Sequence, residues 1–378
     1  MLIVLLGCGD RGIGTNERAW LLTMRPVWIA AARAEHCPRP ALRTPATGDG
    51  STRLRRLNDK DGPEQHCLAE VRKLQPELGP CWPGQTCGPQ ALATIKPHPE
   101  LLDACAPLFA DIEELAHASE ACSPTLAPSS PAEDEVVLNW GSLGNAIRLE
   151  IAPLVAAGQL GEAARRTLDT MRVVDDLGRK STLLGTAFSS YVSFRMVDTL
   201  DELATDPRLT AGDARAMARD LDVLLASAPR WVDVMHHERA YMADFLGTEK
   251  TDFVPSLAEL DVRTREFDRV CSGSLRDCVE HYDDIHDENA FAFKDYVQRL
   301  GLRDYALAFV RMQVELRVAS IQDCSDPARR RAILAPWADH VIVGDECDPV
   351  VTPPMWERGS QYKPRPVPRA LHCIAAAP

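Results

Sequence analysis

The most regular pattern of hydrophobic and polar positions begins at His98. In the stretch PELLDACAPLFADIEELAHASEAC, leucine and alanine recur at intervals of three and four residues. This spacing places apolar side chains along one face of a helix, so the pattern predicts an amphipathic helix here.

The strongest helical pattern follows in NWGSLGNAIRLEIAPLVAAG and QLGEAARRTLDTMRVVDDLG, two predicted helices that meet at Gly158. A third helix is predicted in KSTLLGTAFSSYVSFRMVDTLDELA, and further helices at 211–227, 230–246, 256–269, 275–299 and 303–322. The second helix has a broad apolar stripe, typical of a face that packs into a core. Its residues are Leu160, Ala163, Ala164, Leu168, Met171, Val174 and Leu177.

Strand patterns are nearly absent, and the best candidate is the short VIV at 341–343. The sequence therefore predicts an all-α protein, an irregular multi-helix bundle or array. We expect four parts: a truncated signal remnant (1–8), a coil-rich extension (9–97), a helical domain (98–344) and a Pro-rich tail (345–378). Within the extension, RPALRTPATGDGSTRLRRLNDKDGPEQ has few apolar residues, and we expect it to be coil.

Charge excludes one class of partner. The net charge is −13, and residues 74–349 carry 26 Lys and Arg against 46 Asp and Glu, a net of −20. Affinity for nucleic acid comes chiefly from neutralising phosphates, so a body this acidic is not expected to bind it.

The twelve cysteines bear on whether the protein lies in an oxidising or a reducing compartment. Without a C-x-x-C pair, they lack the spacing of zinc ribbons and thioredoxin-like motifs. Several lie beside Pro or Gly, and the loops CWPGQTC and CSGSLRDC make Cys81–Cys87 and Cys271–Cys278 candidate disulfides. Scattered cysteines in loops favour an oxidising compartment. The alternative is that most are buried free thiols acting as small hydrophobic residues.

The first residues, MLIVLLGCGDRGIG, fit two different signals. Gly7, Gly9 and Gly12 have the spacing of a dinucleotide-binding turn, but no strand–helix alternation follows for its strand to join. Leu5-Leu6-Gly7-Cys8 instead matches the cleavage site of a bacterial lipoprotein, with Cys8 as the lipid-attachment residue. The preceding apolar run is short and lacks a basic residue, so we expect translation to start upstream. The expected partner is a membrane, reached through the lipid on Cys8.

The runs HPELLDACAPLF and RLEIAPLVAAGQLGEAARRTLDTMRVVDDLGRKSTLLGTAFSSY resemble a poorly characterised class of bacterial helical envelope proteins. The resemblance covers about residues 98–250. It implies an N-terminal anchor, a helical hairpin of the A-x-G-x-x-x-x-A type and a location in the cell envelope. It implies no activity.

Candidate catalytic chemistry is limited. Asp283, Asp284 and Asp287 form a D-D-x-x-D motif, similar to the aspartate-rich motif of helical isoprenoid enzymes, which could hold Mg²⁺ against a diphosphate. The alternative is an acidic, solvated helix face. A carboxylate precedes a histidine by three residues at Glu114/His117, Asp233/His236 and Asp283/His286, about as often as chance allows. We therefore expect no catalytic residue and no cofactor, and a binding or scaffolding role. A helical Mg-dependent enzyme and a cytosolic helical regulator remain as alternatives.

Overall fold

The structure is a computed structural model. It describes residues 15–32, 37–74, 92, 95–121, 139–179, 183–228, 233–234, 236–240 and 265, several positions between 307 and 318, and residues 341–343 and 349–351. The helices are α1 (Thr15–Ala32), α2 (Ser51–Leu57), α3 (Pro63–Lys73), α5 (Pro99–His117), α7 (Leu143–Ala156), α8 (Leu160–Gly178), α9 (Leu183–Thr205) and α10 (Ala211–Ala226). The strands are β1 (Thr47–Asp49), β2 (Ala118–Glu120), β3 (Val341–Val343) and β4 (Pro349–Val351).

The all-α fold class is confirmed. Within the described ranges, the strands form two short pairs, β1 parallel to β2 and β3 antiparallel to β4. The short strand predicted from VIV is β3. Among the described residues, no helix is long and apolar enough to cross a bilayer.

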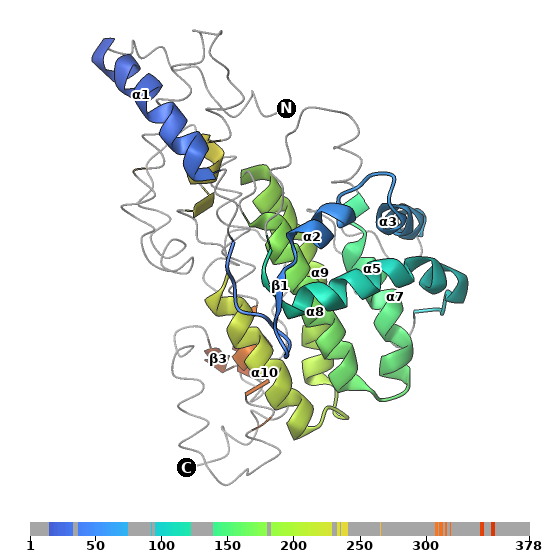
Figure 1. The fold of residues 1–378 in the computed structure, drawn as a ribbon. Helices are drawn as coiled ribbons and strands as arrows, with labels where there is room; N and C mark the ends of the chain where they lie inside the picture. The colour runs from blue at the N-terminus through green and yellow to red at the C-terminus, as the bar shows by residue number, and fades with distance from the viewer. Residues whose placement is uncertain are drawn as a thin grey trace.

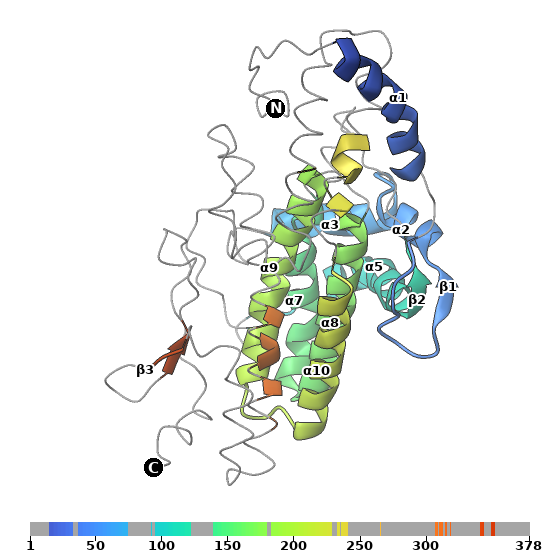
Figure 2. The same cartoon turned by 90° about the vertical axis from the view of Figure 1, so that its left-hand side faces the viewer.

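Helix α8 lies at the centre of the fold. It packs against α5, α7, α9 and α10, and α7 to α10 run side by side, with α5 crossing them (Figures 1 and 2). Every residue from Thr167 to Gly178 is buried. A helix buried on all sides is ordinarily apolar all round. The charged residues of α8 are therefore the unusual feature of this core.

Local sequence explains where the central helices begin and end. Gly158 adopts a φ of 77°, a left-handed conformation that costs glycine little, and it ends α7 before α8 turns back. At the start of α10, the Thr210 side chain accepts a hydrogen bond of 3.1 Å from the backbone N–H of Asp213. Gly178 allows close packing, because a Cβ there would collide with the side chain of Ser189 on α9. The predicted hairpin at Gly158 is present as expected.

The expectation of coil for residues 39–65 is wrong, since α2 and the start of α3 lie there. Residues 37–50, here called the strap, run along the end of α5 and along β2. Their backbone N–H groups at Leu42 and Gly50 donate hydrogen bonds of 2.9 and 2.7 Å to Ala116 and Glu120. Leu54 and Leu57 are fully buried in the same core as the later helices. This segment gains its structure from tertiary partners, which a local count of apolar residues does not detect.

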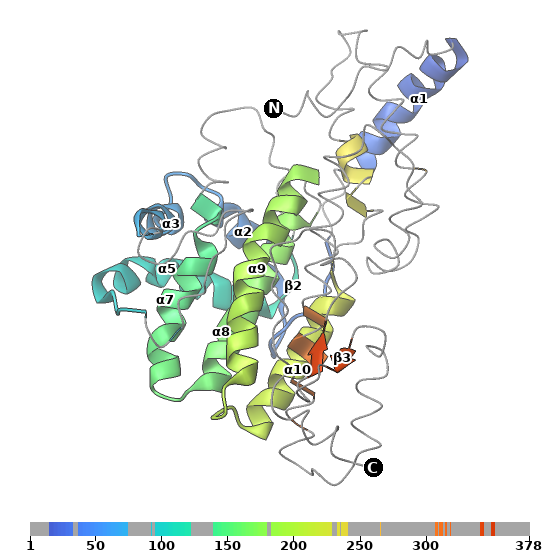
Figure 3. The same cartoon turned by 180° about the vertical axis from the view of Figure 1, so that it is seen from behind.

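The remaining predicted helices are described in part. Residues 233–234 and 236–240 are helical, as are position 265 and the described positions between 307 and 318. The predicted helix at 275–299 lies outside the described residues. Figure 3, the view from behind, shows α9 and α10 in front of the bundle and α1 apart from it.

Candidate functional site

Most residues singled out from the sequence lie outside the described part of the chain, so those predictions stay untested. They are Cys8, the aspartates Asp283, Asp284 and Asp287, and the candidate disulfide cysteines Cys81, Cys87, Cys271 and Cys278.

Two of the three carboxylate–histidine pairs can be located. Glu114 is exposed and its carboxylate lies 3.8 Å from Arg53, while His117 Nδ1 lies 3.0 Å from the carbonyl oxygen of Pro45. In the second pair, His236 Nδ1 lies 2.8 Å from the guanidinium of Arg239. No group of three His, Cys, Asp or Glu residues in the described ranges could hold a metal ion.

Charged residues instead form a row along α8, which we call the charge ladder. The charges of its members alternate in sign, and neighbouring members are four or three residues apart. They therefore share one face of the helix. They are Arg165, Asp169, Arg172, Asp176 and Arg179. The three central members are fully buried. Alternating charges at this spacing ordinarily predict a solvent-exposed face. The sequence therefore gives no reason to place these residues in the core.

The strap supplies two arginines to this ladder. Arg39 Nη2 lies 2.6 Å from Asp176 Oδ2, and neither side chain is exposed. The same guanidinium donates hydrogen bonds of 2.6 and 2.7 Å to the carbonyl oxygens of Ala118 and Leu115. Arg39 therefore ties the strap to the end of α5 and to the C-terminal turn of α8.

Arg43 makes the second connection. Its Nη2 lies 2.7 Å from Asp169 Oδ1, and its Nη1 lies 2.5 Å from Asp220 Oδ2 on α10. Arg165 of the ladder also approaches Asp169, at 3.1 Å. Since one arginine contacts α8 and α10 together, the strap, the ladder and α10 are held in one arrangement.

Arg172 differs from the strap arginines. It is fully buried, and none of its three guanidinium nitrogens has a hydrogen-bond partner in the described part of the chain. Burial lowers the pKa of Arg172 to about 10, although the negative charges of Asp176 and Asp175 favour its charged form. An arginine without hydrogen bonds in a closed core is a cost to stability.

The pKa values of the ladder carboxylates are shifted in the opposite direction, upward. Burial raises the pKa of Asp169 to about 6, although Arg43 and Arg165 stabilise its charge. Burial also raises the pKa of Asp176, against the influence of Arg39. Because burial encloses its three central members, the ladder works as an internal clamp on the strap.

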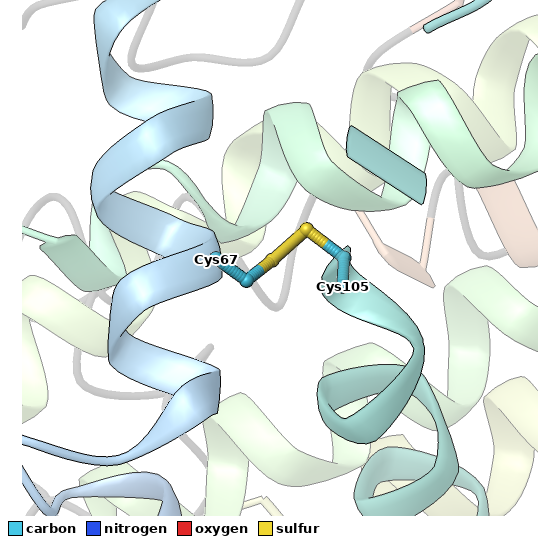
Figure 4. The surroundings of a disulfide bond; sticks show 2 residues. All are labelled: Cys67 and Cys105. Atoms are coloured by element: carbon cyan, nitrogen blue, oxygen red, sulfur yellow. A yellow bond between two sulfur atoms is a disulfide. The ribbon is translucent and has the colours of Figure 1, made fainter. Parts of the chain in front are cut away.

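Disulfides hold the same region. Cys67 of α3 is bonded to Cys105 of α5, with a Cα–Cα distance of 5.0 Å (Figure 4). Both side chains are buried, and the cross-link joins residues 38 positions apart. Cys37, at the start of the strap, is also disulfide-bonded. Each cysteine in the described ranges is therefore oxidised.

Comparison of the chain with protein-family models, with curated proteins and with solved structures finds no match.

Proposed function

We propose that this protein is a cell-envelope lipoprotein, anchored through Cys8, whose helical body faces the periplasm or the outer surface and has a binding or scaffolding role. The observation that carries the proposal is the oxidation state of the described cysteines. Cys37, Cys67 and Cys105 are all disulfide-bonded. Structural disulfides persist in oxidising compartments and are rare in the cytosol.

Two further features support this function. Leu5-Leu6-Gly7-Cys8 supplies the residue pattern of a lipoprotein cleavage site. The strap is fixed to the helical body by Arg39 and Arg43, and the disulfide between Cys67 and Cys105 joins α3 to α5. A body held in one arrangement by covalent and ionic links suits a role in presenting a surface to a partner.

The proposal is tested by fractionating native cells, with and without an inhibitor of lipoprotein processing. We expect the wild-type protein in the membrane fraction, and an unprocessed precursor when the inhibitor is present. Cys8→Ser should lose the anchor. Gly12→Ser is the matched control, because it breaks the Gly-x-Gly-x-x-Gly spacing and leaves Leu5-Leu6-Gly7-Cys8 intact. A wild-type protein that remains in the cytosolic fraction would rule out the anchor.

Thiol trapping separates this proposal from a cytosolic regulator. Cells are lysed in a thiol-blocking reagent, and Cys67 and Cys105 are examined in the peptides that contain them. We expect both to escape blocking until a reductant is added. Blocking of both without reductant would favour the cytosolic alternative.

A further inference from the structure

Helix α1 has a face of exposed, uncharged side chains, and the guanidinium of Arg265 lies over one edge of it, 5.9 Å from the centroid of the Trp20 ring. Its exposed large side chains are Trp20, Leu22 and Val27, whose exposed fractions are 42, 55 and 54%. They are the most exposed large hydrophobic residues in the described ranges. The other α1 residues whose side chains are described as exposed are Ala19, Thr23, Pro26 and Ala30. None of the seven carries a charge.

The other side of α1 is in contact with the protein. Trp28 is buried, and the guanidinium of Arg239 lies over its ring at 4.2 Å from the centroid. Trp20 meets Trp28 edge to face at 5.8 Å. In Figures 1 and 3, α1 stands beside the segment that contains Arg239 and away from α7 to α10. The orientation of α1 is thus set by Trp28, and the uncharged face points outward.

Chain length limits where this face can lie. Six residues, 9–14, separate Cys8 from the start of α1. A fully extended chain of this length spans about 25 Å. A lipid on Cys8 would therefore hold α1 within reach of the bilayer surface. Tryptophan is enriched at membrane–water interfaces, and exposed apolar side chains on a helix favour the boundary between headgroups and acyl chains.

We propose that the exposed face of α1 (Trp20, Leu22 and Val27) lies in the interfacial layer of the bilayer that holds the Cys8 anchor. This inference rests on the proposed function. The anchor supplies attachment, and α1 lies along the surface next to it. The acidic helical body is then held close to the membrane.

The test uses the full-length chain with Cys8→Ser, so that no lipid contributes to binding. This protein is floated with vesicles of phosphatidylethanolamine and phosphatidylglycerol. We expect it to float, and we expect Leu22→Gln with Val27→Gln to weaken the partition by at least about tenfold, because two apolar side chains leave the lipid. The matched control is Ala106→Gln with Ala110→Gln, at two exposed positions of α5. The control should bind like its parent.

A second measurement does not depend on the folding of the double variant. Vesicles with brominated acyl chains should quench tryptophan fluorescence of the Cys8→Ser protein, and Trp20→Phe should remove much of that quenching. The inference fails if the Cys8→Ser protein does not float, or if the double variant floats equally well. A third outcome would also refute the inference. In that outcome the protein binds no vesicles and forms a dimer, and Leu22→Gln with Val27→Gln dissociates that dimer. The face would then be a self-interface.

The two proposals can fail separately. Vesicle binding by the Cys8→Ser protein reports on α1 alone, whereas lipid on Cys8 in native cells reports on the anchor alone.

Discussion

Replacing both Cys67 and Cys105 with alanine should lower the free energy of unfolding substantially. The disulfide joins α3 to α5 and closes a loop of 38 residues. In the chain-entropy description, a cross-link over that loop length stabilises the folded state by about 4 kcal/mol. Both side chains are buried. Alanine leaves no buried polar group behind, so the change measures mainly the loss of the covalent link.

The assay is urea unfolding followed by far-ultraviolet circular dichroism, with the wild type and the double variant compared without reductant. The control is the exposed pair Ala106→Gln with Ala110→Gln, which should leave the midpoint within error. The reasoning would be refuted by equal unfolding midpoints for the wild type and the double alanine variant, with Cys67 and Cys105 in the wild type found as free thiols.

Four further substitutions test the core. Arg39→Met should cost about 3–5 kcal/mol because it removes the cation nearest to the buried Asp176, whereas Arg172→Met should cost less because this arginine has no hydrogen bond to lose. Gly158→Ala should cost about 1 kcal/mol because its φ of 77° suits glycine. Burial raises the pKa of Glu150 to about 7, so the folded protein binds its proton more tightly than the unfolded chain does. Stability from this group is present below the unfolded pKa of about 4.5 and is lost as the pH rises through about 7. Glu150→Gln should therefore gain stability relative to the wild type, by about 2–3 kcal/mol, between about pH 5 and about pH 8.

Each of these is measured by urea unfolding, and each has a contrary outcome. Equal losses for Arg39→Met and Arg172→Met would mean that Arg172 is paired. An unchanged midpoint for Gly158→Ala would mean that the turn between α7 and α8 is not left-handed. Parallel pH profiles for Glu150→Gln and the wild type would mean that Glu150 is solvated.

The helices of the bundle could be predicted because their evidence is local. The apolar stripe from Leu160 to Leu177 defines α8, and Gly158 marks the turn before it. The strap and α2 could not be predicted in the same way. Leu54 and Leu57 become buried only because α5 and α8 lie against them, and such distant partners leave no periodic signal nearby.

The burial of the charge ladder could not be predicted from the sequence for a related reason. Charges alternating from Arg165 to Arg179 have the same pattern whether the face is solvated or buried, and only Arg39 and Arg43, more than a hundred residues earlier, show that it is buried. The cross-link of Cys67 to Cys105 was also not singled out, because the sequence drew attention to cysteines close together in loops. Covalent partners on two separate helices cannot be recognised from spacing alone.

The central claim is that Cys8 attaches this protein to a membrane of the cell envelope. The most direct measurement is the mass of the N-terminal peptide of the protein purified from its native cell. A peptide that begins at Cys8 and carries the mass of a diacylglyceryl group is the predicted result. A peptide that continues from Leu6 and Gly7 into an unmodified Cys8 would contradict the claim.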